Sequence, residues 1–157
     1  MSKIIYTNSD GTVSIITPAG DVNNAIKDVP SGLSYEIVED SAIPTDRSFR
    51  NAWKQNSKTI ETDMTKAKEI HKDKIRIART PKFAELDIEF QKALETSSST
   101  TDIVAKKQLL RDAPAASGIS TAASEADLKA QWDTTNLGAS PYLSLIHISE
   151  PTRRRHI

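Results

Sequence analysis

Hydrophobic and polar positions alternate along the first sixty residues of the chain. Two β-branched and aromatic runs, KIIYT and TVSIIT, fall within residues 3–17 and flank Asp10-Gly11, where glycine supplies the positive φ that a hairpin connection needs. Further strand candidates follow at residues 35–38, 48–53 and 58–62. Two strands alone are marginal in water, so we expect four or five short strands to form one twisted sheet.

From Asp63 onward the spacing of the apolar residues changes from two to about 3.6, which predicts helices. Asp63 or Thr62 can cap the first helix. The pair Thr80-Pro81 ends this helix and begins a second, because threonine suits the N-cap and proline the first helical position. The apolar residues that we expect to face inward are Met64, Ala67, His71, Ile75 and Ala78 in the first helix, and Phe83, Leu86, Phe90 and Leu94 in the second.

Two further segments break the helical pattern. Residues 97–101 form a serine and threonine turn, and residues 113–120 form a small-residue linker that contains proline and glycine. Between them we expect a third helix over residues 102–111, and after them a last short helix that Ser124 caps. The residues expected to face inward here are Val104, Leu109, Leu110, Leu128 and Trp132.

The shift from strands to helices near residue 63 predicts an α+β fold with segregated layers: a small N-terminal antiparallel sheet followed by three or four helices. We expect a β-rich subdomain over residues 1–62, a helical segment over residues 63–132 and an irregular end over residues 133–142.

Residues 143–153 read LSLIHISEPTR, which matches the translation of a common sequencing-library adapter, residue by residue. We therefore interpret residues 143–157 as an artefact and exclude them from the fold. The alternative is a genuine basic tail that binds nucleic acid or a membrane. Without this segment the chain has a net charge of −2 and one histidine, His71.

The composition excludes several kinds of site. The chain has no cysteine, and therefore no disulfide, thiolate metal site or thiol nucleophile. It contains no apolar run of the roughly 18 residues that would predict a membrane span, and its start lacks the apolar stretch of a signal peptide. We expect a soluble cytosolic protein that does not contact a membrane.

Motifs of known chemistry are also missing from the sequence. The five glycines are scattered singly, so no phosphate-binding loop is predicted, and we predict no metal ligands, cofactor or catalytic residues. Glu85, Asp87 and Glu89 are candidates for acid/base work, but they flank an apolar stripe and are typical of a solvated helix face. His71, on an apolar face, is interpreted as a packing residue rather than a pH switch or ligand.

A basic segment over residues 66–82 offers a binding alternative. It holds seven lysines and arginines against Glu69 and Asp73, and a phosphate backbone would be attracted to such a surface. No aromatic residues interleave for base stacking, so a solvated helix flank is the preferred interpretation. The alternative hypothesis is a small nucleic-acid-binding or regulatory protein that uses Lys68, Lys72, Arg76 and Arg79.

Read as ordered phrases, the sequence resembles small proteins encoded in the tail modules of tailed bacteriophages and prophages. The phrases are KIIYTNSDGTVSI, YEIVEDSAIPTDRSFRNAW, DMTKAKEIHKDKIRIAR, LDIEFQKALE, VAKKQLLRD and DLKAQW, which together extend over residues 3–132. The stretch DRSFRNAW at residues 46–53 is the most specific, and QLLRD is similar to a phrase of tail-fibre assembly proteins and tail assembly chaperones. Related chains often end in Trp-Pro after the last helix, whereas this one continues past Trp132.

This resemblance implies a non-enzymatic protein that aids tail or tail-fibre assembly or remains as a minor virion component. Its partners would be phage tail or tail-fibre proteins, met in the host cytoplasm during assembly or in the virion. For Trp53 and Trp132 we expect a core role first and a role as binding anchors second. The candidate partner contacts are Arg47, Phe49, Arg50, Trp53, Leu86, Phe90, Leu109 and Leu110.

Overall fold

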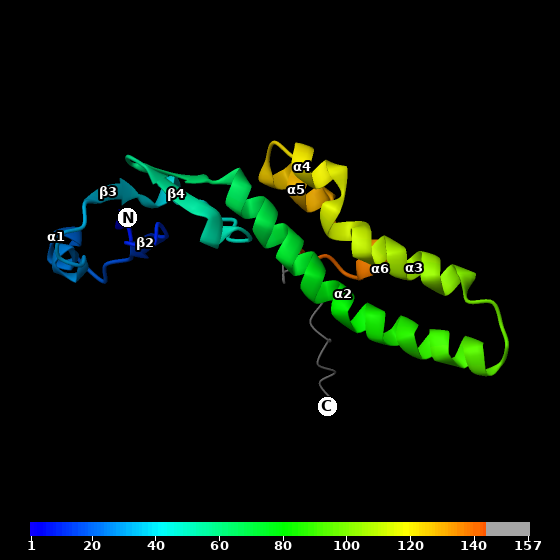
Figure 1. Ribbon diagram of the computed structural model, residues 1–157. Coiled ribbons are helices and arrows are strands. Elements are labelled where there is room, and N and C mark those ends of the chain that lie inside the picture. The colour runs from blue at the N-terminus through cyan, green and yellow to red at the C-terminus, as the bar shows by residue number, and fades with distance from the viewer. Residues whose placement is uncertain (144–157) are drawn as a thin grey trace, which may run out of the picture.

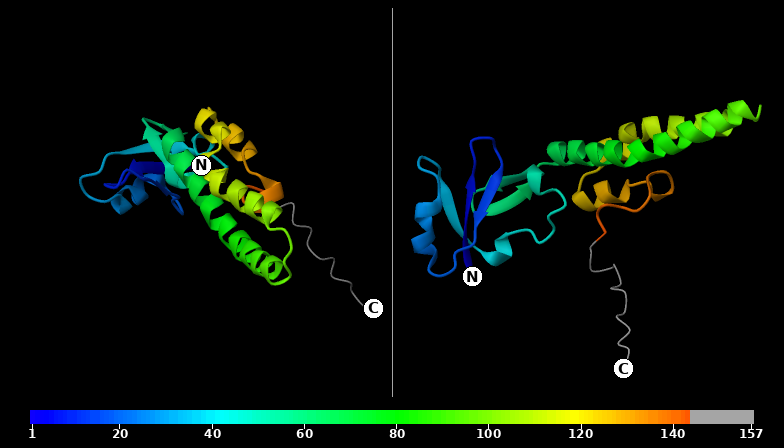
Figure 2. Two further views of the ribbon diagram at one scale, coloured as in Figure 1. Left: turned by 45° about the vertical axis from the view of Figure 1, so that its right-hand side comes forward. Right: turned by 90° about the horizontal axis from the view of Figure 1, so that it is seen from below.

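In the computed structural model, which describes residues 1–143, five strands lie before residue 63 and the long helices lie after it. The predicted α+β fold is confirmed. Figures 1 and 2 show the strands and the far end of the helical hairpin at opposite ends of an elongated molecule. The β-rich half and the far turn of the hairpin therefore lie at opposite ends, and the elements after α2 return toward the strands.

The first three strands form an antiparallel sheet in the order β2-β1-β3, from β1 (Ser2–Thr7), β2 (Val13–Ile16) and β3 (Tyr35–Glu39). The predicted hairpin joins β1 to β2, with Ile5 paired to Ile15 and with Gly11 at φ 82°. The short helices α1 (Val22–Ala25) and η1 (Ile26–Asp28) lie between β2 and β3, and η2 (Asp40–Ala42) follows β3.

The other two strands, β4 (Trp53–Asn56) and β5 (Thr59–Thr62), form a separate two-stranded hairpin. They do not join the first three strands in the single sheet that we expected. The strand predicted over residues 48–53 was wrong except at its last residue. A turn and the 3₁₀ helix η3 (Arg50–Ala52) occupy that range, because Phe49 is buried against the helices and the chain cannot stay extended. The core of this β module consists of Ile5, Val13, Val38, Ile43, Trp53 and Ile60.

Helix α2 runs without a break from Met64 to Glu95, and Asp63 caps it by accepting from the amides of Thr65 and Lys66. The predicted break at Thr80-Pro81 was wrong. A proline inside a helix leaves the carbonyl four residues earlier without its donor. Pro81 lies on the exposed side, where water can bind that carbonyl, while Ile75 and Leu86 on the other side belong to one core and hold both halves in line.

Helix α3 (Thr101–Asp112) returns antiparallel to α2. Arg79 near the middle of α2 donates to the carbonyl of Leu110 at 3.0 Å, and Asp87 further along pairs with Lys107 at 2.6 Å. The connecting turn places Ser97 at φ 53°, a left-handed conformation in which a helix commonly ends. The predicted inward positions Leu94, Val104 and Leu109 were wrong, because all three side chains are exposed.

The remaining chain folds back along α2 and α3. It contains η4 (Ala113–Ala115), α4 (Ser117–Thr121), α5 (Glu125–Ala130) and α6 (Thr134–Leu137). Ser124 caps α5, as predicted, whereas the expected linker at residues 113–120 and the irregular end at residues 133–142 each contain a short helix. The core of this helical body consists of Phe49, Ala52, Ala67, Ile75, Leu110, Ile119, Ala122, Leu128, Trp132 and Leu137.

The predicted boundary at residue 62 falls at the end of β5, but Phe49 and Ala52 from the β-rich half belong to the core of the helical body. The adapter-like range lies outside the described residues except for Leu143. Within residues 1–143, no helix has both the length and the apolar composition that crossing a bilayer requires.

Candidate functional site

Residues 46–53 form the joint between the core of the β module and the core of the helical body. Asp46 begins the segment with a side-chain turn: its Oδ1 accepts from the backbone amide of Ser48 at 2.9 Å and from the Ser48 hydroxyl at 2.6 Å. Phe49 and Ala52 then enter the core of the helical body, and Trp53 enters the core of the β module. One short stretch of chain thus holds the two halves together.

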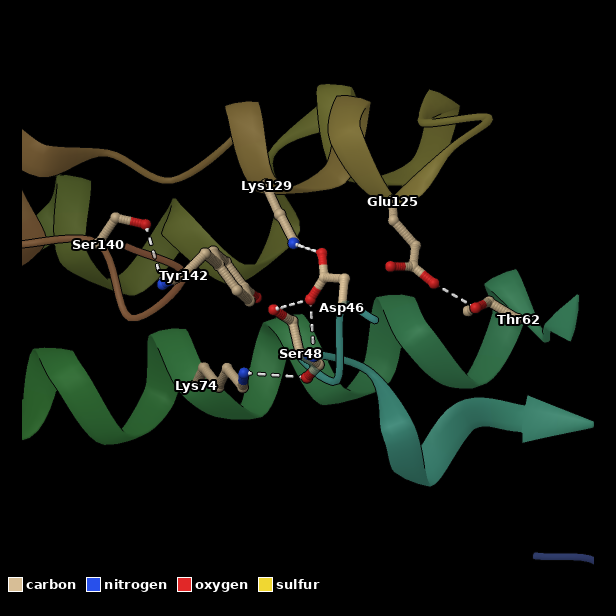
Figure 3. Close-up of polar contacts among 8 residues, drawn as sticks. All are labelled: Asp46, Ser48, Thr62, Lys74, Glu125, Lys129, Ser140 and Tyr142. Atoms are coloured by element: carbon tan, nitrogen blue, oxygen red, sulfur yellow. Dashed lines mark hydrogen bonds and ion pairs between the residues drawn. The ribbon is translucent and has the colours of Figure 1, made fainter. Parts of the chain in front are cut away.

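Helix α5 makes one polar contact with the joint and one with the end of β5, and both are drawn in Figure 3. Lys129 forms an ion pair with Asp46, and the hydroxyl of Thr62 donates to Glu125. Hydrogen bonds from Lys129 and then from Ser48 lower the pKa of the Asp46 carboxyl to about 2. The carboxylate that positions the turn therefore stays charged at neutral pH.

Four aromatic side chains from four segments meet beneath this joint. The rings of His71 and Tyr142 stack with 7° between their planes and 5.6 Å between their centroids. Trp132 meets both edge-on, and Phe49 lies 5.4 Å from Tyr142. The cluster brings together α2, the joint, the segment between α5 and α6, and the end of the described chain.

The partners of His71 are unusual for a buried polar residue. Its Nδ1 lies 2.6 Å from the Tyr142 hydroxyl, whereas its Nε2 is buried without a hydrogen-bond partner among the described residues. Burial, and to a smaller degree the charge of Lys74, lowers the pKa of His71 to about 4. Burial also raises the pKa of the Tyr142 hydroxyl. Both groups are therefore neutral at pH 7, and the expected packing role of His71 is confirmed.

Two lysines cover the outer side of the aromatic cluster. The Lys74 Nζ lies 4.5 Å from the centroid of the Tyr142 ring and donates to the carbonyl of Ser48 at 3.3 Å, while the Lys129 Nζ lies 5.6 Å from the same centroid. Burial and the neighbouring charge of Lys129 lower the pKa of Lys74, and Asp46 offsets part of this effect. The charges of Lys74 and Lys129 are thus both close enough to interact with the Asp46 carboxylate, which pairs directly with Lys129.

A hollow of about 550 Å³ opens above these groups. Arg47, Lys74 and Lys129 line it together with Asp46, so three positive charges face one negative charge. The Ser48 and Tyr142 side chains add polar and aromatic surface. This arrangement is suited to receive an acidic group of a partner, since an additional carboxylate would balance the local charge.

The structure separates the eight predicted contact residues into two groups. Phe49, Trp53 and Leu110 are at most 2% exposed, so their side chains form part of the cores and offer no surface to a partner in this structure. All three are large apolar side chains, which are more often buried than exposed in folded proteins. For Trp53 the core role expected first is confirmed. The residues that remain accessible are Arg47, Arg50, Leu86, Phe90 and Leu109.

Of the accessible residues, only Arg47 lines the hollow at the joint. Leu86 lines a smaller hollow of about 320 Å³ between α2, α3 and α6, with buried Leu110 beneath it. Phe90 is partly covered by Lys107, whose Nζ lies 4.7 Å from the ring centroid. Leu109 is 56% exposed at the edge of a third hollow. The candidates therefore do not converge on one site.

The four basic residues of the alternative hypothesis gather along one side of α2, and each has a partner within the chain. Lys72 pairs with Glu69 at 2.8 Å and Arg76 with Asp73 at 2.5 Å. Lys68 donates to a backbone carbonyl of α4, and Arg79 donates to two backbone carbonyls of α3. These contacts hold the basic side chains in place and reduce the charge available to a phosphate.

The three carboxylates considered for acid/base work, Glu85, Asp87 and Glu89, are exposed, which confirms the prediction of a solvated face. Asp87 pairs with Lys107 and Glu85 with Lys82. In the part of the chain that the structure describes, no group of three or more acidic or histidine side chains is placed to hold a metal ion.

Sequence reasoning missed Asp46, Lys74, Lys129 and Tyr142 as parts of the joint. Asp46 carried a local signal, because an aspartate two residues before a serine often forms a side-chain turn. Lys74, Lys129 and Tyr142 carried no local signal. Lys129 lies 83 positions from its partner Asp46, and Tyr142 lies in a range expected to be irregular.

No protein-family model matches the chain, and neither the curated proteins nor the solved structures contain one with significant similarity to it.

Proposed function

We propose that this chain is a non-enzymatic phage tail-module protein that acts through protein–protein contacts, either by aiding tail or tail-fibre assembly or as a minor part of the virion. The observation that carries the proposal is the double role of residues 46–53. The phrase that most resembles phage tail proteins is also the one that joins the two cores through Phe49 and Trp53, while it leaves Arg47 and Arg50 exposed.

The hollow above the joint is the proposed contact surface. Arg47 is free of the core, and Lys74 and Lys129 are held beside it by the Tyr142 ring and by the Asp46 turn. A tail protein that presents an acidic side chain or loop would meet preorganised positive charge, which favours fast and selective association. The partners we propose are therefore acidic surfaces of tail or tail-fibre subunits.

The first experiment distinguishes the two versions of the proposal. Deletion of the gene in the phage or prophage that encodes the chain should yield particles with defective tails or fibres. Mass spectrometry of purified wild-type virions then separates a structural component, which is present, from an assembly factor, which is absent. Intact tails and fibres after deletion would overturn both versions.

The second experiment tests the contact surface. In the deletion background, a copy that carries Arg47→Glu and Arg50→Glu should restore far fewer complete tails than the wild type. A copy that carries Lys27→Glu and Lys58→Glu is a matched control, because these lysines are also exposed and neither lines the hollow at the joint. Equal rescue by both copies would contradict a contact at the joint.

The nucleic-acid hypothesis, which rests on residues 66–82, remains the alternative. It predicts salt-dependent binding to DNA or RNA that weakens when Lys68, Lys72, Arg76 and Arg79 are made neutral. Because all four already have partners within the chain, we place this function second. A mobility-shift assay at low salt tests it, and the absence of a shift would end it.

A further inference from the structure

A groove of about 490 Å³ lies between the end of α3 and the segment that leads into α6. One side is formed by the last turn of α3 with η4, the other by Gln131, Asp133 and Leu137, and α2 contributes Ile75 between them. Helix α6 lies against both α2 and α3, as Figure 1 shows. The groove shares no lining residue with the hollow at the joint, so it is a separate surface.

Most of the groove is lined by apolar side chains. Ile75 and Leu137 are at most 5% exposed and belong to the core of the helical body, while Leu109 is 56% exposed at the edge. The other apolar lining residues are Ala113, Ala115 and Ala116. Their small side chains leave the groove open. A side chain with an aliphatic portion would therefore find apolar surface to contact.

The wall opposite α3 is held in place by local contacts. The side chain of Gln131 lies so close to Gly118 that a Cβ atom at this glycine would overlap it. The Asp133 carboxylate accepts from the backbone amides of Thr135 and Asn136 at 3.0 and 3.1 Å and thereby caps α6. The groove is therefore a preformed feature of the fold.

The charges of the groove are all negative. Asp112 and Asp133 line it from its two sides, and no lysine or arginine of the described chain lines it. Within residues 1–143 neither carboxylate has an ion-pair partner. Asp112 accepts from the side-chain amide of Gln108 at 2.9 Å, and the side-chain amide of Asn136 lowers the pKa of Asp133. These donors are neutral, so both negative charges remain uncompensated.

Asp112 also occupies an unfavourable position in its own helix. It is the last residue of α3, where the negative end of the helix dipole repels a carboxylate. Arg79 donates to the carbonyls of Leu110 and Arg111 and offsets part of this dipole. The stability of α3 therefore gives no reason for a carboxylate at this position, whereas a cation in the groove would.

We propose that this groove binds an arginine-bearing segment of a partner protein. The methylene groups of the arginine would lie on the apolar lining, and its guanidinium would donate to the carboxylates of Asp112 and Asp133. Arginine is suited better than lysine, because its planar group carries five donors and can serve more than one carboxylate. The hollow at the joint is suited to acidic groups, so the two surfaces select partners of opposite charge.

A peptide titration of the full chain tests the proposal. The probe is the tripeptide arginyl-leucyl-arginine, acetylated and amidated at its ends, and its binding is followed by the backbone amide resonances. Residues that line the groove should shift with a Kd on the order of 1 mM, and residues that line the hollow at the joint should not. The same peptide with citrulline in place of arginine keeps the shape but loses the charge, and it should bind about tenfold more weakly.

The variant Asp112→Asn with Asp133→Asn tests the carboxylates. Asparagine caps a helix about as well as aspartate, so α6 should remain folded, and the amide spectrum verifies this. The arginine peptide should bind this variant about tenfold more weakly. Glu95→Gln with Asp102→Asn is the matched control, because it also removes two exposed carboxylates, which lie outside the groove, and it should bind like the wild type.

Three results would overturn the proposal: no shift at the groove up to about 10 mM peptide, equal affinity for the citrulline peptide, or unchanged affinity of the Asp112→Asn and Asp133→Asn variant. All measurements use the isolated chain without any phage component, and none uses the hollow at the joint. Their failure would therefore leave the tail-module function standing, and failure of that function would leave the groove as a binding site.

Discussion

His71 illustrates how burial decides the chemistry of a residue. An unperturbed imidazole titrates near pH 6.5, but this one is fully buried, stacked on Tyr142 and close to the positive charge of Lys74. Its charged form is therefore disfavoured in the folded chain and not in the unfolded chain. The residue links the stability of the aromatic cluster to pH.

We predict that the chain loses stability between pH 6.5 and pH 4. Within this window the unfolded state binds a proton at His71 and the folded state, with a pKa of about 4, does not, so the free energy of unfolding falls as the pH falls. The loss is about 3 kcal/mol from this residue. Urea titrations at several pH values measure it.

The matched variant for this prediction is His71→Phe, which keeps an aromatic ring and removes the titrating group. Its unfolding free energy should depend less on pH between 6.5 and 4, whatever its absolute value. The Asp46 carboxylate, with a pKa of about 2, contributes only at lower pH. A pH slope equal to that of the wild type would show that His71 is not the cause.

Trp53 is the largest fully buried side chain of the molecule, and its indole Nε1 lacks a hydrogen-bond partner in residues 1–143. Trp53→Ala should therefore lower the free energy of unfolding by about 3–5 kcal/mol. Trp53→Phe should cost clearly less, because it keeps most of the apolar contact and removes an unpaired buried donor. Urea midpoints compare the two, and an unchanged midpoint for Trp53→Ala would place this ring outside the core.

Single residues also show where sequence periodicity stops being informative. Leu110 is buried as predicted, but its neighbour Leu109 is exposed, because adjacent positions on a helix point about 100° apart and only one can face α2. Val104 and Leu94 lie near the free turn of the hairpin, where α4, α5 and α6 no longer cover the helices. Their exposure depends on the extent of the neighbouring elements, which the local pattern does not encode.

At the scale of elements, the first hairpin and the helix caps followed local rules, whereas the segment at residues 48–52 and the continuity of α2 did not. The hairpin at Asp10-Gly11, the cap at Asp63 and the cap at Ser124 are set by a few adjacent residues, so they could be predicted. Whether Thr80-Pro81 breaks a helix depends on what packs on either side of it. That information lies in the helices that fold back along α2.

Pro81 should therefore lower the free energy of unfolding, and its replacement should restore stability. Pro81→Ala restores a backbone N–H to the middle of α2 and should raise the free energy of unfolding by about 1–3 kcal/mol, since proline in a helix interior costs up to about 3 kcal/mol relative to alanine. Thermal unfolding followed by circular dichroism measures the gain. Pro30→Ala, in a loop, is the control and should change stability little. A destabilising Pro81→Ala would mean that the proline is required where it stands.

At the scale of the whole molecule, the residues after Trp132 complete the helical body. The Trp132 Nε1 donates to the carbonyl of Gly138 at 3.0 Å, Leu137 is buried, and Tyr142 stacks on His71. The contact between His71 and Tyr142 spans 71 positions, and all three contacts involve a range that the sequence marked as irregular. The joint was therefore predictable only in part: its central phrase stood out, and the side chains that close it did not.

A chain that ends at Tyr142 should be more stable than one that ends at Trp132 by at least about 3 kcal/mol, because the shorter chain exposes the ring of His71 and loses the burial of Leu137. Chemical unfolding of both chains measures the difference. Tyr142→Ala in the longer chain separates the contribution of the ring from that of α6. Equal stability of the two chains would show that the aromatic cluster does not need its last member.

The hairpin of α2 and α3 is attached to the rest of the molecule at one end only, and its turn at Ser97 stands clear of the other elements. A helix of 32 residues is about 48 Å long. A helix of this length amplifies small rotations at its base, so a tilt of about 10° relative to the joint at residues 46–53 would displace the far turn by about 8 Å. A partner that binds at the joint and changes this angle would therefore move the far turn.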